Sequence, residues 1–285
     1  MHTILCLGEI LWDVYPGRKY LGGAPMNVAV HASKLGCRSY MISAVGRDEL
    51  GNTARAQLEL RGVNCRCVTV TDYPTGTAIV HPELDGDSRF DLPENVAYAQ
   101  TNLSESDLAA MIRLAPDAVV FGTMAAKRSD TVAVSLDRLL AVLPNTERLY
   151  DVNIRKQLYD RELVSDLLDR TTILKLNDDE VDTLSFLLFD DVMSADRFAR
   201  FILDEYPCHT VVVTRGAQGA DAYTREAETA IHVDAIPVEV ADTVGAGDAF
   251  AAAYLAAWLK THDVKTALQA GNANGAKTAS HAGAF

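Results

Sequence analysis

The sequence predicts an α/β fold in which a mostly parallel sheet carries helices on both faces. Apolar stretches of strand length alternate with segments of helical period along most of the chain, which is the pattern of repeated strand–helix–strand units. The 285 residues are 48% hydrophobic and 23% charged, a composition typical of a globular protein with a large core. We therefore expect one domain spanning residues 1–285.

Sheet strands are expected where a short apolar stretch precedes a segment of helical period. The predicted strands are Thr3–Gly8, Ser39–Val45, Ala118–Gly122, Arg148–Asn153, Thr172–Asn177 and Thr210–Thr214. The predicted helices are Ala24–Leu35, Leu50–Arg61, Glu105–Arg113, Thr131–Leu143, Asp179–Leu188, Ala195–Glu205, Asp248–Lys260 and Val264–His281. No internal repeat or low-complexity linker interrupts this series, which supports a continuous α/β core.

Three stretches depart from the alternation. Ile10–Leu21 and Thr77–Tyr98, the latter with a polar turn at 85–87, read as β-ribbon, and together they predict a small lid formed by about residues 10–21 and 77–98. Gly219–Val240 reads as short strands and turns. We therefore expect antiparallel additions to the parallel core.

Charge and composition exclude several function classes. The net charge of -13 repels a phosphate backbone, so we expect no nucleic-acid partner. No run of about 18 apolar residues occurs, and the first residues carry no basic segment before an apolar one, so we expect a cytoplasmic protein without a membrane partner. The five cysteines are an odd number without metal-site spacing, so we expect reduced thiols.

The stretch DTVGAGDAF, residues 242–250, leads into an apolar helix. Gly245, Ala246 and Gly247 have little or no side chain, so their backbone N–H groups could converge on an anion at the helix N-terminus. Asp248 follows them, and one interpretation makes it only the N-cap of the helix. In the other, this carboxylate takes the proton of a hydroxyl that attacks a phosphoryl group.

The second interpretation describes a kinase that lacks the common nucleotide-binding motifs. The sequence has no G-x-x-x-x-G-K-[ST], no H-R-D and no H-E-x-x-H, which excludes a P-loop NTPase, a protein kinase and a zincin metalloprotease. The phosphates would then be held by backbone amides and local cations.

Two signatures resemble those of the ribokinase-like (PfkB) carbohydrate kinases. DTVGAGDAF is similar to the C-terminal signature of that family, and LGGAPMNVAVHASKLG with AVGRDELG looks like its N-terminal signature, about 200 residues earlier. The resemblance spans nearly the whole chain. It implies a ribokinase-like fold, ATP and Mg²⁺ as cofactors, a sugar as the acceptor, and a homodimer formed through the lid.

The resemblance also implies residues for the nucleotide and the cations. Asn177 and Glu180 match the N-x-x-E motif, in which Glu180 would hold Mg²⁺ through water, although the same pair would also form a helix capping box. The other nucleotide-binding positions that match are Thr214, Arg215, Gly216, Gly219 and Asn272. Asp242 and the carbonyl of Val244 match positions that hold K⁺ in many relatives. A simple turn at 213–219 and a surface position for Asn272 are the structural alternatives.

On the acceptor side, the matching residues are Asp13, Gly22, Gly23, Asn27 and Asn153. Asp13 and Asn27 would hydrogen-bond sugar hydroxyls, while the glycines allow the backbone to approach the sugar. Arg155 ends the D-x-N-x-R pattern Asp151–Arg155, and would neutralise the migrating phosphoryl group. The alternatives are a turn residue at 13, a flexible joint at 22–23 and a surface arginine at 155.

The D-x-N-x-R pattern is similar to that of fructokinases and 2-keto-3-deoxygluconate kinases. We therefore expect an ATP-dependent sugar kinase, a phosphotransferase with an alcohol acceptor, and most directly a fructokinase. 2-Keto-3-deoxygluconate kinase and ribokinase are the alternatives within the family, and a non-catalytic sugar-binding regulator is the alternative of another class.

Overall fold

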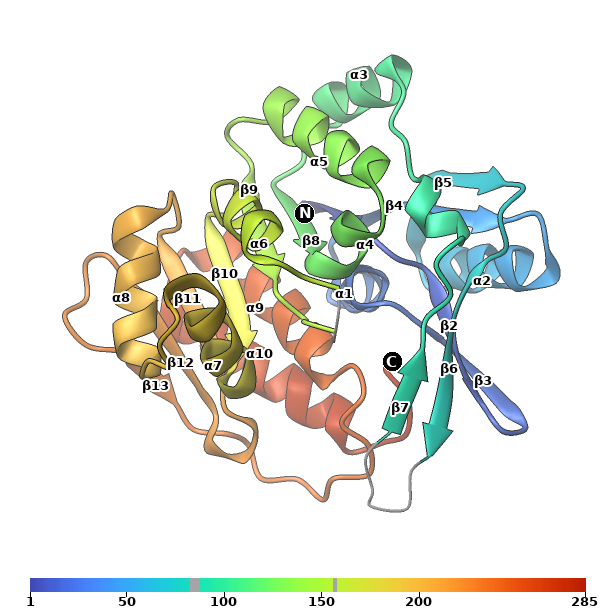
Figure 1. Cartoon of the computed structure of the whole chain (residues 1–285). Coiled ribbons are helices and arrows are strands. Elements are labelled where there is room, and N and C mark those ends of the chain that lie inside the picture. Colours follow the sequence, from blue (N-terminus) through green and yellow to red (C-terminus); the bar gives the residue numbers. More distant parts are fainter. Residues whose placement is uncertain (83–87, 156–157) are drawn as a thin grey trace.

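The computed structural model describes the backbone of residues 1–82, 88–155 and 158–285, and the side chains of these ranges outside 80–90. A sheet of nine strands runs through its centre in the order β13-β12-β11-β10-β9-β8-β1-β4-β5 (Figure 1). The strands are β1 (Thr3–Leu7), β4 (Arg38–Gly46), β5 (Val63–Thr71), β8 (Ala118–Gly122), β9 (Glu147–Asp151), β10 (Ile173–Asn177), β11 (Thr210–Thr214), β12 (Ala220–Thr224) and β13 (Ile231–Val233). All neighbours from β5 to β11 pair in parallel, and β12 and β13 add antiparallel strands.

Helices cover both faces of this sheet, as a parallel sheet requires. One face carries α3 (Glu105–Leu114), α4 (Thr123–Arg128), α5 (Asp130–Val142), α6 (Arg161–Leu168), α7 (Asp178–Phe189) and α8 (Ala195–Glu205) (Figure 1). The other face carries α1 (Ala24–Lys34), α2 (Glu49–Leu60), α9 (Ala246–Thr261) and α10 (Val264–Ala279). The expected α/β fold, a mostly parallel sheet with helices on both faces, is therefore confirmed.

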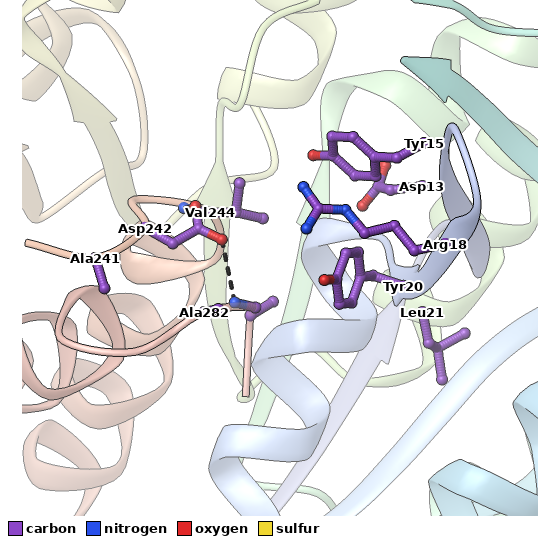
Figure 2. Close-up of a pocket in the computed structure, with 11 residues that line it drawn as sticks. Asp13, Tyr15, Arg18, Tyr20, Leu21, Ala241, Asp242, Val244 and Ala282 are labelled. Carbon is purple, nitrogen blue, oxygen red and sulfur yellow. Dashed lines mark hydrogen bonds between the residues drawn. The ribbon is translucent and has the colours of Figure 1, made fainter.

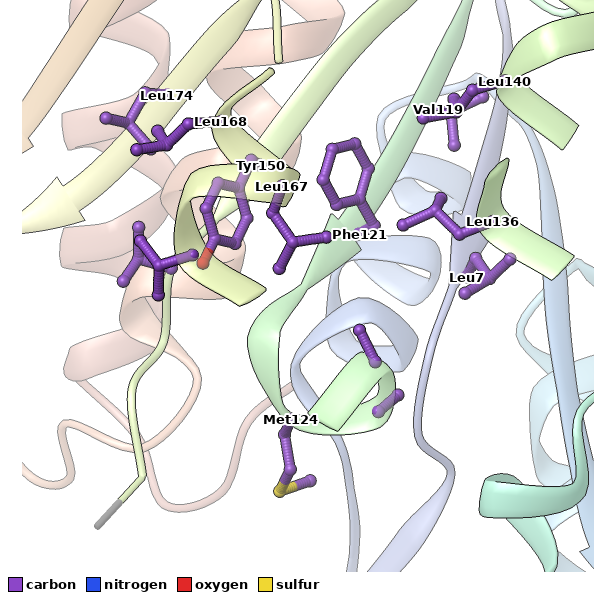
Figure 3. Close-up of a cluster of buried hydrophobic side chains, with 14 of the residues drawn as sticks. Leu7, Val119, Phe121, Met124, Leu136, Leu140, Tyr150, Leu167, Leu168 and Leu174 are labelled. Carbon is purple, nitrogen blue, oxygen red and sulfur yellow. The ribbon is translucent and has the colours of Figure 1, made fainter. Parts of the chain in front are cut away.

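The core divides into two layers because successive side chains of a strand point to opposite faces. In β1, Leu5 and Leu7 pack with the α3–α8 layer, whereas Ile4 and Cys6 pack with the α1 and α9 layer. Figure 3 shows part of the first layer, where the Phe121 and Tyr150 rings stack with centroids 5.5 Å apart. The sheet thereby holds the carboxyl ends of its central strands in fixed positions.

A second sheet of four strands projects from the core in the order β3-β2-β6-β7 (Figure 1). It consists of β2 (Leu11–Tyr15), β3 (Arg18–Gly22), β6 (Gly76–Pro82) and β7 (Ser88–Asp91). Both predicted ribbons are therefore present, but the second ends at Asp91. Residues Ala97–Gln100 form a short 3₁₀ turn that is buried against the core, and the predicted turn at 85–87 lies outside the described residues.

All the predicted strands and helices are present, and three elements were missed. β5 was missed because it is an edge strand whose buried and exposed residues alternate, so it contains no continuous apolar run. The short helices α4 and α6 lie in stretches between predicted elements, and α4 starts directly after the predicted strand Ala118–Gly122. The structure also starts α9 at Ala246 rather than at Asp248.

No helix in the described ranges combines the length and hydropathy needed to cross a bilayer. All five cysteines lie in the described ranges and none is in a disulfide, as expected of reduced thiols.

Candidate active site

A cavity of about 270 Å³ lies where β1, β9 and β10 end and α9 begins. This is the edge at which open α/β sheets bind ligands. The predicted residues that line it are Asp13, Gly23, Asn27, Asn153, Arg155, Asn177, Glu180, Val244, Gly245, Gly247 and Asp248. Residues that are more than 200 positions apart, such as Asn27 and Asp248 with a separation of 221, therefore share one site.

The Gly-Ala-Gly loop forms the N-terminal end of α9. Gly245 is the N-cap and has the left-handed φ of 77°, and no side chain caps this helix end. A Cβ atom on Gly245 would lie 2.5 Å from Cβ of Ala284, and one on Gly247 would lie 3.1 Å from Nζ of Lys175. The loop therefore requires glycine at 245, a Cβ at 247 would crowd Lys175, and the positive end of the helix is left open to an anion.

Asp248 is the third residue of α9 and does not cap it, so the N-cap interpretation of this residue is wrong. Its Oδ2 atom instead accepts a hydrogen bond of 2.7 Å from Nδ2 of Asn27 on α1. Burial and the negative charge of Asp151 raise the pKa of Asp248 to about 7, against the opposing effects of Asn27, Lys175 and Arg155. A carboxylate with this pKa can take up a proton near neutral pH.

Asp13 lies on the opposite side of the cavity, in the middle of β2, where it pairs with Tyr20 and Ala78. The interpretation of Asp13 as a turn residue is therefore wrong. Burial raises its pKa to about 6, and the charge of Arg155 acts in the opposite direction. A Cβ atom on Gly22 would lie 2.5 Å from Oδ2 of Asp13, so this glycine leaves space for the carboxylate.

Gly23 is the N-cap of α1 and has a φ of 121°. A Cβ atom there would lie 2.3 Å from the carbonyl oxygen of Glu9. Gly22 and Gly23 thus allow a close approach of backbone segments at a fixed position, which contradicts the reading of this pair as a flexible joint.

The segment after β9 brings Asn153 and Arg155 to the cavity. Asn153 has a left-handed φ of 37°, a conformation that asparagine adopts more readily than most residues. The following N–H, that of Ile154, donates a hydrogen bond of 2.9 Å to Oε1 of Glu180. Arg155 is exposed and lines the cavity, so the surface position and the site position both apply to it.

Asn177 and Glu180 form the capping box of α7. Glu180 is 8% exposed, its Oε2 accepts the N–H of Asn177 at 3.0 Å, and its Oε1 accepts that of Ile154. Burial raises its pKa, and Lys175 opposes this shift. Each carboxylate oxygen has a second lone pair that can accept from a water molecule. The donor set therefore fits Mg²⁺ held through water, since Mg²⁺ usually keeps several waters and binds few protein carboxylates.

Two charged residues that line the cavity were not among the predicted site residues. Lys175 is 6% exposed and forms an ion pair with Asp151, with 2.9 Å between Nζ and Oδ1. Glu9 is 2% exposed, and its Oε1 accepts the N–H of Ala24, the first residue of α1, at 3.0 Å. A lysine inside the apolar stretch ILKLN was the available signal for the first of these, because a lysine is almost never buried without a partner.

The remaining nucleotide-binding candidates lie beside the cavity rather than in its lining. Thr214 pairs with Asn177 across β11 and β10. Arg215 forms an ion pair of 2.9 Å with Asp221, and Gly216 begins the short 3₁₀ turn Gly216–Gln218 with a φ of 52°.

Asn272 links this region to β13. It is 9% exposed, so its reading as a surface residue is wrong. Its Nδ2 donates to the carbonyl oxygens of Val233 and Asp234 at 2.9 and 3.0 Å. A Cβ atom on Gly219 would lie 2.1 Å from the same Val233 oxygen, which fixes this backbone next to the turn after β11.

A second cavity of about 330 Å³ adjoins the first and shares Asp13, Tyr15 and Val244 with it. Figure 2 shows Arg18 between the rings of Tyr15 and Tyr20 in this cavity, at 5.1 and 5.6 Å from their centroids. The positive guanidinium of Arg18 therefore lines the second cavity.

On the opposite side of this second cavity, Asp242 ties the loop before α9 to the last residues of the chain. Its Oδ1 accepts the N–H of Val244 at 3.0 Å, and its Oδ2 accepts that of Gly283 at 3.1 Å (Figure 2). His31 on α1 contacts the same segment, because its Nε2 lies 2.7 Å from the carbonyl oxygen of Ala284. In the described residues, no group of three or more His, Cys, Asp or Glu side chains is arranged to hold a metal ion, so K⁺ would depend on Asp242 and carbonyl oxygens.

Residues 8–285 match the model of the pfkB family of carbohydrate kinases. The chain belongs to this family. An ATP-dependent 6-phosphofructokinase of Thermoanaerobacterium thermosaccharolyticum is 24% identical, and the alignment covers 100% of this chain and 90% of that relative. A protein named "Probable fructokinase-5" of Arabidopsis thaliana is 29% identical, with 99% and 93% covered. These relatives differ in the sugar that they name.

Solved structures agree with this membership. An Escherichia coli protein described as a candidate ribokinase II, in complex with ATP and Mg²⁺, matches with a TM-score of 0.84 and 26% identity over 100% of this chain and 94% of that chain. An engineered double mutant of fructokinase from Vibrio cholerae O395, with fructose, ADP and a potassium ion bound, has the same TM-score at 22% identity and the same coverage. The present chain is therefore an ATP-dependent carbohydrate or nucleoside kinase, a phosphotransferase with an alcohol acceptor.

Proposed function

We propose that this kinase is a fructokinase. The observation that carries the proposal is the meeting of Asp13, Asn27, Asn153 and Asp248 around one small cavity. These side chains offer hydrogen-bond acceptors and donors to several hydroxyl groups of one sugar. They lie next to the Gly-Ala-Gly loop at 245–247, which we call the phosphate loop. The Asp151–Arg155 pattern and the similarity to the Arabidopsis protein named as a fructokinase also support fructose.

The chemistry follows from the geometry of the cavity. Asp248 takes the proton of the acceptor hydroxyl, and the freed oxygen pair attacks the γ-phosphorus. The N–H groups at the Gly245–Gly247 end of α9 hold the oxygens of the migrating group, where negative charge must be stabilised. Arg155 adds positive charge from the exposed side of the cavity. Bound Mg²⁺ would neutralise phosphate charge, and Glu180 would hold it through water.

We assign the adenine nucleotide to the region beside the cavity. Thr214, Arg215, Gly216 and Gly219 would line its phosphates, and Asn272 would fix the strand beside its base. The relative from Escherichia coli binds ATP and Mg²⁺, which supports these two cofactors. Asp242 and the Val244 carbonyl would hold K⁺ behind the phosphate loop.

We further propose that residues 1–285 form one kinase domain, with 10–21 and 77–98 as its lid. The outer strands β3 and β7 each have one edge without a partner strand in the described chain. Unpaired edges promote association with a second chain, so a homodimer formed through the lid is proposed. Size-exclusion chromatography with light scattering tests this, and a monomer at micromolar concentration would refute it.

A specific observation favours 2-keto-3-deoxygluconate as a second acceptor. Arg155 is exposed at the cavity, and its guanidinium makes no hydrogen bond or ion pair within the described part of the chain. Its planar guanidinium could bind the carboxylate of an acid sugar in a bidentate manner. Fructose has no carboxylate, so it could not form this bidentate contact with Arg155.

A coupled ADP-release assay across five acceptors tests the proposal: fructose, ribose, 2-keto-3-deoxygluconate, fructose 6-phosphate and adenosine. We expect the highest kcat/KM with fructose, by about tenfold or more over the next acceptor. A higher value with another acceptor would refute the fructokinase assignment and leave the kinase class intact. Absence of ADP release with every acceptor, from folded protein, would favour the sugar-binding regulator.

A further inference from the structure

Lys175 is a buried cation at the phosphate loop. It lies on β10 between Leu174 and Leu176, which both pack with the α3–α8 layer. Lys175 therefore faces the layer of α9, where Ile173 also packs. The parallel register places it directly beside Asp151 on β9.

Asp151 satisfies only part of the hydrogen-bonding capacity of the Lys175 ammonium group. Nζ of Lys175 donates to Oδ1 and Oδ2 of Asp151 at 2.9 and 3.2 Å. An ammonium group has three N–H donors, and the third has no partner in the described part of the chain. This group also lies next to Gly247, where an added Cβ would be 3.1 Å from Nζ.

Two features of this position oppose a buried ammonium group, although the carboxylates of Asp151, Glu180 and Asp248 outweigh burial and raise the pKa of Lys175. The N-terminus of a helix carries partial positive charge and repels a cation, and a buried ion pair contributes little net stability because both charges lose water. The position becomes more favourable for the lysine when an anion binds at the loop. The N-terminal end of α9 and the ammonium group then both face the negative charge of that anion.

The charges around the cavity add a second argument. Four carboxylates line it, those of Glu9, Asp13, Glu180 and Asp248, together with two cations. Arg155 is exposed, whereas Lys175 is buried. A phosphoryl group that enters this negative cavity meets one cation shielded from water, where electrostatic contacts are strongest.

We propose that Lys175 is a catalytic residue whose ammonium group hydrogen-bonds an oxygen of the γ-phosphoryl group during transfer. The proposal rests on the kinase activity of the family and not on the choice of fructose. The bond between the acceptor oxygen and phosphorus forms while the bond between phosphorus and the ADP oxygen breaks. The electron pair of the broken bond stays on ADP, the hydroxyl proton goes to Asp248, and Lys175 stays protonated. Asp151 is a positioning residue that orients the ammonium group.

Three variants test this proposal with the best acceptor of the wild-type protein. Lys175→Met removes the ammonium group but leaves Asp151 buried without its partner, which can destabilise the fold. Lys175→Met/Asp151→Asn removes both charges and avoids this cost. Lys175→Arg keeps the charge but lengthens the side chain. Thermal unfolding of each variant identifies the folded ones before kinetics are measured.

We expect the folded double variant to lose about 100-fold or more in kcat, with a sugar KM within about threefold of wild type. Calorimetry supplies a second readout with ADP alone and with ADP plus aluminium fluoride, a mimic of the transferring group. The double variant should bind the mimic about 100-fold more weakly and ADP nearly as well. Arg197→Met/Asp191→Asn removes an exposed ion pair between α8 and the segment before it and serves as the control.

The opposite result is specific. If Lys175 only neutralises Asp151, the double variant recovers a kcat close to wild type and binds the aluminium fluoride complex normally, which would overturn the proposal. Because the assay uses whichever acceptor gives activity, failure of the fructose assignment leaves this test valid.

Discussion

Asp248 shows how much the role of a residue depends on its place in a helix. At the N-cap it would only accept a backbone N–H, whereas at the third position of α9 its carboxylate is bound by Asn27 and faces the cavity. Burial then raises its pKa towards the range of a general base.

Asp248→Asn should leave the fold intact and lower kcat by roughly 100-fold to 10,000-fold, because loss of a general base typically has this effect. The amide oxygen of asparagine can still accept from Asn27, so the structural contact is conserved. ADP-release kinetics measure the change, and calorimetric ADP affinity is the control. A kcat close to wild type would show that another group accepts the proton.

The pH dependence of kcat/KM should report the two raised carboxyl pKa values. Asp248 and Asp13 must be ionised to accept a proton and to bind sugar hydroxyls, so activity should rise with pH through about 6 to 7 and level off above about 8. Rates measured from pH 5 to 9 test this. Asp13→Asn should remove the lower of the two transitions, and an unchanged profile in that variant would assign both transitions elsewhere.

The residues that the sequence could identify are those within a spaced motif. Asp248, Asn27 and Gly23 are recognisable from their neighbours along the chain, and all three line the cavity. Lys175 and Glu9 are not, because their roles arise from contacts across strands and at a helix end. Periodicity reports burial but does not say which buried charge faces a cavity.

At the scale of elements, the β2–β3 ribbon fixes the acceptor side of the cavity. Its antiparallel register sets Asp13 opposite Tyr20, and Gly22 ends the ribbon directly before α1. The position of Gly22 at the end of this ribbon therefore determines how much space the Asp13 carboxylate has, and we propose that this carboxylate binds the sugar.

Gly22→Ala should raise the sugar KM on the order of tenfold, because the added Cβ would lie 2.5 Å from Oδ2 of Asp13 and must displace it. ATP affinity should change little. Steady-state kinetics with both substrates measure the difference, and Lys19→Ala on the exposed face of the same strand is the control. An equal loss for sugar and ATP would indicate a general disturbance of the fold.

Helices and strands could be predicted where the apolar residues follow the expected pattern along the whole element. The central strands have buried residues on both faces and read as continuous apolar runs, whereas β5 is half exposed and does not. α9 begins directly after Gly245, the N-cap, which has a positive φ. The start of the helix therefore depends on a backbone conformation, and the sequence indicates this conformation only through a run of small residues.

For the whole molecule, the site has a cost in stability. The folded pKa of Asp248 lies above its value in the unfolded chain, so ionisation of this group opposes folding. This penalty is absent at a pH below the unfolded pKa of about 4, grows between about 4 and 7, and is complete above about 7. Function at neutral pH is thus linked to a less stable fold.

Asp248→Asn should therefore stabilise the protein at pH 8, on the order of 2 kcal/mol, and should have little effect at pH 4. Urea unfolding at both pH values measures the free energy of unfolding of wild type and variant. A stabilisation of equal size at both pH values would contradict the linkage, since it could not come from ionisation.

The contact between Asn27 and Asp248 also has a consequence for folding kinetics. The two residues are 221 positions apart, and His31 and Ala284, on the same helix and in the final segment, are 253 apart. Contacts between residues so distant in the chain carry a large loop-closure entropy and tend to form after local structure. The parallel strands can pair before α1 and α9 meet, so the proton-accepting site should be among the last parts to assemble. A refolding chain should then regain its tryptophan fluorescence earlier than its ability to release ADP, and the delay between the two signals would measure how late the catalytic contact closes.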